Sequence, residues 1–112
     1  MALNVAAPKV VHPTDRPRNL EEGKAFLIDR CLHQANPLAE TNQEAAYDTI
    51  QQLKGLDGAN WAAAWGATAD RCEREAEEAA RRGDKKAELE ARIQAYAFNF
   101  VGRYPSPNHP DK

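Results

Sequence analysis

The chain has 112 residues, of which 42% are hydrophobic and 29% charged, and its formal net charge is −2. This length allows one small domain with a modest core, and the interleaved acidic and basic residues give no basic field for a nucleic-acid backbone. Because the sequence has neither a long apolar run nor the pattern of a secretory signal, we expect no membrane association and a cytoplasmic location.

The N-terminal segment, residues 1–18, carries Pro8, Pro13 and Pro17. Each proline lacks an amide donor and disfavours helix at the residue before it. We therefore expect an arm that is extended or disordered. A helical domain over 19–104 and a proline-rich tail over 105–112 complete the predicted organisation.

A first helix is predicted over about residues 20–35. Asn19 is a favourable N-cap, and Glu21 and Glu22 suit the positive end of a helix. Apolar residues then recur at helical spacing, and Asn36-Pro37 is expected to end the helix.

A second, shorter helix is predicted to begin after Thr41. The residues from Thr41 to Glu44 match a capping box with Thr41 as the cap. Ala46, Ile50 and Leu53 form its narrow apolar face, and the helix is predicted to run to about residue 54. Gly55 would end it in the left-handed conformation.

The second half of the chain predicts a long antiparallel helical hairpin over about 60–82 and 84–102, which makes the fold class all-α with four helices. Gly83 ends the first of these helices and Asp84 caps the second, so the reversal is tight. The predicted apolar stripe of the last helix consists of Leu89, Ile93, Tyr96 and Phe100, with Ala87, Ala91, Ala95 and Phe98 beside it.

Aromatic residues gather at the open end of this hairpin. Antiparallel packing should bring Trp61 and Trp65 to Phe98 and Phe100. In one interpretation they are the best-packed part of a small core; in the other, some of them face a partner or a ligand. The candidate interface or substrate-pocket residues are Trp61, Trp65, Tyr96, Phe98, Phe100, Tyr104 and His109.

No set of catalytic or metal-ligating residues is recognisable. Ser106 is the single serine and lies between two prolines, without the glycine-flanked turn of a serine nucleophile. The histidines are far apart in sequence and have no metal-ligand spacing. Cys31 and Cys72 fall within apolar stripes and are predicted as buried free thiols rather than a disulfide or reactive pair. We expect no catalytic residue, metal or cofactor.

The order of these features resembles a known enzyme region. The pattern is similar to the N-terminal helical region of α/β-hydrolases. It consists of Trp61-x3-Trp65, then Ala69 and Ala76, Gly83-Asp84, Ala91, Tyr96 and a tail with Tyr104-Pro105. The branch concerned includes the 2,6-dihydroxypseudooxynicotine hydrolase and the fermentation–respiration switch esterase-like proteins, and the resemblance covers about residues 37 to 110.

The resemblance implies a cap or lid that shapes a substrate pocket and takes part in dimer contacts. Its partner would be an α/β-hydrolase core, on the same precursor or on a separate chain, which supplies every catalytic group. The resemblance predicts continuation into a sheet, whereas the sequence stops at Lys112. A separately encoded cap, a fragment of a longer hydrolase and a domain that has lost its enzyme are all compatible with this ending.

A second interpretation is a small helical interaction module of tetratricopeptide-like character. A helical hairpin with alanines at close-contact positions and a Gly-Asp turn is also how such repeats are built. Only one such unit is visible in the sequence, whereas solenoids generally need about three.

Overall fold

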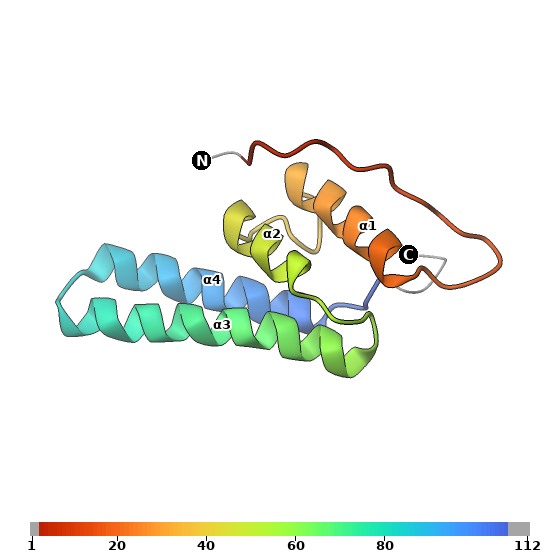
Figure 1. Ribbon diagram of the computed structural model, residues 1–112. Helices are drawn as coiled ribbons and strands as arrows, with labels where there is room; N and C mark the ends of the chain where they lie inside the picture. Colours follow the sequence, from red (N-terminus) through yellow and green to blue (C-terminus); the bar gives the residue numbers. More distant parts are fainter. Residues whose placement is uncertain (1–2, 108–112) are drawn as a thin grey trace.

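The computed structural model describes residues 3–107, which contain four α-helices and no β-strand. The helices are α1 (Leu20–Leu32), α2 (Gln43–Gln51), α3 (Gly58–Arg81) and α4 (Lys85–Arg103). α3 and α4 form a long antiparallel hairpin, and α1 and α2 lie against the end of it that is remote from the turn (Figure 1). The predicted all-α class and the hairpin are confirmed.

α1 begins where the sequence predicts. The Glu22 amide donates to Asn19 Oδ1 at 2.8 Å, and the Asn19 amide donates to Glu22 Oε1 at 3.0 Å, so a capping box is present. The helix ends at Leu32, three residues before the expected end, because Gln34 adopts the left-handed conformation with φ of 48°. The Asn36–Pro37 peptide that follows is cis.

α2 differs from its prediction at both ends. Its N-cap is Asn42, whose Oδ1 accepts from the Ala45 amide at 3.0 Å, whereas the Thr41 hydroxyl donates back to the Leu38 carbonyl at 2.9 Å. The helix ends at Gln51, well before Gly55, and Gly55 does not have a positive φ. The predicted apolar face is nevertheless buried, although Leu53 lies just beyond the helix.

The α3–α4 turn is built as predicted. Gly83 has a φ of 75°, and Asp84 Oδ1 accepts from the Ala87 amide at 3.1 Å to cap α4. α3 starts at Gly58, slightly earlier than expected, because Asp57 is its N-cap and accepts from the Asn60 amide at 3.2 Å. The turn fixes the antiparallel direction of the two helices.

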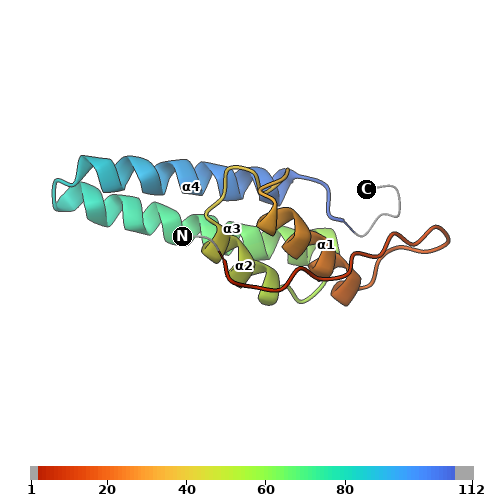
Figure 2. The same cartoon turned by 90° about the horizontal axis from the view of Figure 1, so that it is seen from above.

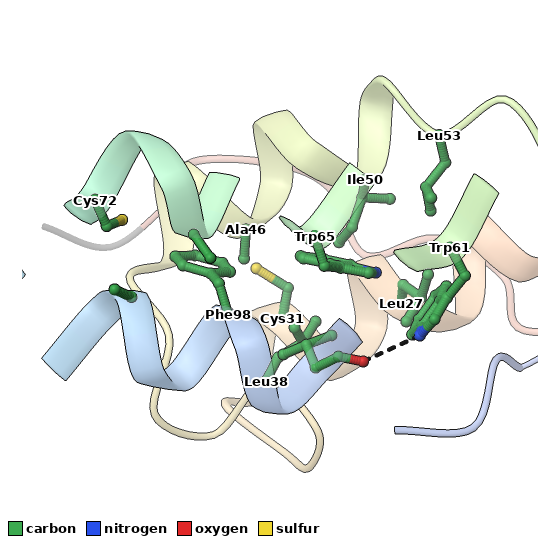
Figure 3. Close-up of a cluster of buried hydrophobic side chains, with 13 residues drawn as sticks. Leu27, Cys31, Leu38, Ala46, Ile50, Leu53, Trp61, Trp65, Cys72 and Phe98 are labelled. Atoms are coloured by element: carbon green, nitrogen blue, oxygen red, sulfur yellow. Dashed lines mark hydrogen bonds between the residues drawn. The ribbon is translucent and has the colours of Figure 1, made fainter. Parts of the chain in front are cut away.

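The core lies where α1 and α2 meet the open end of the hairpin (Figure 3). The rings of Trp65 and Phe98 stack with centroids 6.0 Å apart, and Trp61 meets Trp65 edge-on at 5.5 Å. Trp61 Nε1 donates to the Val101 carbonyl at 3.0 Å. The other large members of this cluster are Leu27, Leu38, Ile50 and Leu53.

The predicted apolar stripe of α4 is wrong. The face turned to α3 consists of Ala95, Phe98 and Val101, with Ala97 also buried, whereas Leu89, Ile93, Tyr96 and Phe100 are exposed. α3 presents small residues to α4, namely Ala69, Ala76 and Ala79. The distance between two packed helices depends on the side chains at the contact, so small residues on both sides allow the closest approach. Leu89, Ile93, Tyr96 and Phe100 therefore point away from α3.

The N-terminal arm is extended over residues 3–18 and runs along α1 (Figures 1 and 2). Its contacts centre on Arg18, which is 3% exposed. The Arg18 guanidinium donates to the Val11 carbonyl at 3.1 Å and the Pro107 carbonyl at 2.9 Å, and it lies 4.5 Å from the centroid of the Phe26 ring. The arm, α1 and the start of the tail are thus joined through one side chain, whose pKa burial lowers.

Candidate interaction surface

The structure divides the seven candidate site residues into two groups. Trp61, Trp65 and Phe98 are buried in the core, so their rings pack against each other rather than offering surface to a partner. Tyr96, Phe100 and Tyr104 are exposed. His109 lies outside the described residues. The aromatic end of the hairpin therefore contains both a core and a surface.

The exposed group belongs to one row along α4, which we call the α4 face and define as Leu89, Ile93, Tyr96, Phe100 and Tyr104. Their exposed fractions are 62%, 50%, 70%, 40% and 38%, respectively. Spacings of three and four residues place the first four on one side of α4, and Tyr104 is the C-cap residue that follows the helix. The Phe100 and Tyr104 rings contact each other with centroids 5.7 Å apart. A continuous strip of large apolar side chains is therefore open to solvent.

One edge of the α4 face is bounded by the loop between α1 and α2. This loop lies beside α4 in Figure 2 and is fastened to it by Gln94. Gln94 Oε1 accepts from the Asn42 amide at 2.7 Å, and its Nε2 donates to the Glu40 carbonyl at 3.1 Å. These two bonds hold the loop as a fixed wall.

Two adjoining hollows lie between this wall and α4. One of about 240 Å³ is lined by Asn36, Pro37, Glu40, Tyr96, Ala97 and Phe100. The next, of about 470 Å³, shares Glu40 and reaches Glu90 and Ile93. Together they form a groove along the α4 face, with an apolar part beside Pro37 and a more polar part beside Glu90.

The charges around the α4 face are separated by position. Glu40 and Glu90 lie on the loop side, and neither carboxylate forms an ion pair within residues 3–107. Arg92, on the α3 side, bridges to Glu73 at 3.2 Å and to Glu88 at 3.0 Å. The basic side chains of Lys86 and Arg103 are exposed near the two ends of α4 and likewise make no ion pair in the described part of the chain.

The two cysteines and the single serine are each held within the packed part of residues 3–107. Cys31 and Cys72 are buried and free, as predicted, and burial raises the pKa of both thiols, which leaves little nucleophilic thiolate near neutral pH. The Ser106 hydroxyl donates to the Leu56 carbonyl at 2.6 Å. No group of three or more His, Cys, Asp or Glu side chains within residues 3–107 is placed to hold a metal ion.

Another hollow, of about 600 Å³, lies along the hairpin and is bordered by α2. Its lining combines small alanines with charged residues of both signs, and the Cys72 thiol is part of it. Phe98 is the one large apolar side chain in its lining, and Phe98 is fully buried in the core. Among the described residues, no helix is long and apolar enough to cross a lipid bilayer. The exposed large hydrophobic side chains of residues 3–107 belong to the α4 face.

Comparisons with protein-family models, with curated protein sequences and with solved structures found no match. The family resemblance thus rests on the residues quoted for it from this sequence alone. The sequence signalled Tyr96, Phe100 and Tyr104 as candidates, but it did not signal Pro37 or Glu40. Their position beside α4 depends on contacts between segments far apart in sequence. An example is the hydrogen bond between Gln94 and Glu40, which are 54 residues apart.

Proposed function

We propose that this protein is a helical association domain of the cap type, which covers a partner polypeptide with its α4 face. The observation that carries the proposal is the exposure of five large apolar side chains in one row beside a fixed loop. Contiguous exposed apolar surface that is edged by charged residues is typical of protein interaction sites. Aromatic residues are enriched at such interfaces because they offer large contact area, and tyrosine adds a polar group.

The resemblance to α/β-hydrolases supports a hydrolase core as the partner. In that arrangement the core supplies the nucleophile, acid and histidine, and this chain supplies surface over the mouth of the substrate pocket. Tyr96, Phe100 and Tyr104 are the side chains that would reach the core, because Trp61, Trp65 and Phe98 are occupied in this chain's own packing. The described residues need no catalytic group for such a role.

A stand-alone helical interaction module is the second candidate. The close alanine packing between α3 and α4 favours it, since this packing gives the hairpin its own interface without a partner. Such a module would use the same α4 face but bind targets other than a hydrolase. The two candidates therefore differ in the identity of the partner and agree on the surface.

The test is the mass of the native species purified from its source, measured by size-exclusion chromatography with light scattering, and its chain content, measured by denaturing mass spectrometry. We expect either a native chain much larger than 12.4 kDa or a complex with a defined second chain, and the added part is a hydrolase core if the cap proposal holds. A Tyr96→Glu/Phe100→Glu variant should lose the second chain. An Ala62→Glu/Ala67→Glu variant, with both changes at exposed positions of α3, should keep it. A native species with the mass of these 112 residues alone, 12.4 kDa, would contradict the proposal.

A further inference from the structure

Within the α4 face, the four residues Leu89, Ile93, Tyr96 and Phe100 are flanked at both ends by charged residues with the same spacing. Lys86 lies three residues before Leu89, and Arg103 lies three residues after Phe100. The row Lys86, Leu89, Ile93, Tyr96, Phe100 and Arg103 has alternating steps of three and four residues. This 3.5-residue average is the spacing of a seam at which one helix packs along another. Its 18 positions span about 25 Å at about 1.5 Å per residue.

A second copy of the chain does not suit this seam. If two α4 helices packed in parallel and in register, Lys86 would face Lys86 of the copy, and Arg103 would face Arg103. If they packed antiparallel with the seams aligned, each Lys86 would lie beside an Arg103. Both arrangements bring like charges together at both ends of the contact, and like-charge contacts oppose association. Neither cation has an acidic partner among the described residues that would relieve this repulsion.

A helix with the opposite charges at its ends suits the seam. Acidic residues at both ends would meet Lys86 and Arg103 in either direction of packing, while the apolar centre covers Ile93, Tyr96 and Phe100. On the loop side, Glu40 and Glu90 border the groove and favour basic side chains along that edge of the incoming helix. The loop held by Gln94 borders the groove along α4, so an elongated occupant such as one helix can lie beside it.

From this complementarity we propose that the occupant of the α4 face is an amphipathic helix of a different polypeptide. It has about 18 residues, an apolar seam, and acidic residues at both ends of that seam. The inference rests on the proposed association function and specifies the part of the partner that docks. In a hydrolase partner it would be a surface helix of the core; in any other target it would be a helical segment of the same chemistry.

The experiment uses two synthetic 18-residue helical peptides with identical composition and net charge. One has Glu at the two ends of its apolar seam and Lys on its outer face; in the other, these Glu and Lys residues are exchanged. Binding to the full chain is measured by fluorescence anisotropy at low and at high salt. We expect the acidic-ended peptide to bind about tenfold more tightly at low salt, with a smaller difference at high salt.

Charge reversal on the protein gives the matched test. A Lys86→Glu/Arg103→Glu variant should prefer the basic-ended peptide. A Lys54→Glu/Arg74→Glu variant, with the same change in net charge at exposed positions away from the seam, should keep the wild-type order. Equal binding of the two peptides, or an order that reversal at the seam leaves unchanged, would overturn the inference. A homodimer that Tyr96→Glu dissociates would also overturn it, because the occupant would then be a second copy.

The proposed function can fail separately from this inference. If neither peptide binds but the native complex still requires Tyr96 and Phe100, the helical occupant is wrong and the association function stands. If neither peptide binds and the native complex forms without Tyr96 and Phe100, both proposals are wrong.

Discussion

The Trp65 and Phe98 rings are stacked, with an angle of 11° between their planes, and they join the first part of α3 to the last part of α4. Phe98 is fully buried by this contact, and Phe100, two residues later, is 40% exposed. Residues two apart on a helix point about 200° from each other, so burying Phe98 turns Phe100 outward. The core contact therefore sets the rotation of α4 and, with it, the orientation of the α4 face.

Truncation of Trp65 should cost far more stability than truncation of Tyr96. Trp65→Ala removes a fully buried ring and is expected to lower the free energy of unfolding by about 3–5 kcal/mol. Tyr96→Ala removes a ring that is 70% exposed and should change it by less than about 0.5 kcal/mol. Urea denaturation of both variants measures the difference. Equal losses in the two variants would contradict the assignment of Trp65 to the core and Tyr96 to the surface.

The α3–α4 turn should depend on the backbone conformation of Gly83 rather than on space around it. A Cβ at this position would have no neighbour within 4 Å, but φ is +75°. Gly83→Val is expected to lower the free energy of unfolding by about 1–2 kcal/mol through backbone strain alone. Gly83→Asn should cost less, because asparagine tolerates the left-handed conformation better than valine. Urea titrations that give the same value for both variants would argue against strain as the cause.

Two helical glycines should respond to alanine in opposite directions. At Gly23 in α1, an added Cβ would lie 2.5 Å from Leu56 Cδ1, so Gly23→Ala must displace a buried leucine and should cost about 1–3 kcal/mol. At Gly66 in α3, nothing lies within 4 Å, and Gly66→Ala should stabilise the fold by about 0.5–1 kcal/mol. Thermal and urea unfolding measure both changes. If Gly23→Ala is stabilising, the close packing of α1 on the loop before α3 is wrong.

Acid should weaken the start of α1 through Glu22. Hydrogen bonds from the Arg16 guanidinium, and then from the Asn19 amide, lower the pKa of Glu22 from 4.5 to about 2. Because the pKa is lower in the folded state, the stabilisation is present above about pH 4.5 and is lost as the pH falls towards 2.

The measurement for this prediction is urea denaturation between pH 2 and pH 6 for the wild type, Glu22→Gln and Glu21→Gln. The stability difference between wild type and Glu22→Gln should shrink as the pH falls through this range. Glu21→Gln, a change at an exposed position of the same helical turn, is the control for removing one carboxylate from the start of α1. Identical pH profiles for wild type and Glu22→Gln would refute the role of Glu22.

Local sequence patterns predicted the parts of the fold that depend on neighbouring residues. The N-cap at Asn19 and the Gly83-Asp84 turn involve residues close in sequence, and both are present in the structure. At α2 the prediction of Thr41 as the cap is wrong, because the Asn42 side chain makes the capping bond and the Thr41 hydroxyl donates to the Leu38 carbonyl instead.

The rotation of α4 could not be read from hydrophobicity. Leu89, Ile93 and Tyr96 form the more apolar row, yet close approach to the alanines of α3 buries the row with Ala95 instead. The groove beside Pro37 could likewise not be predicted from local sequence patterns, because it exists only where the α1–α2 loop and α4 meet. The candidate surface therefore depends on tertiary contacts, and the sequence identified only its aromatic residues as interface candidates.

The most direct measurement of the central claim is site-specific photo-crosslinking of the full chain in its native cellular setting. A photoreactive amino acid replaces Tyr96 in one variant and Ala67, which is exposed on α3, in the control. Our account predicts that position 96 forms an adduct with one defined segment of a second polypeptide, while position 67 does not. If position 96 forms no adduct beyond that of position 67, the α4 face does not dock a partner.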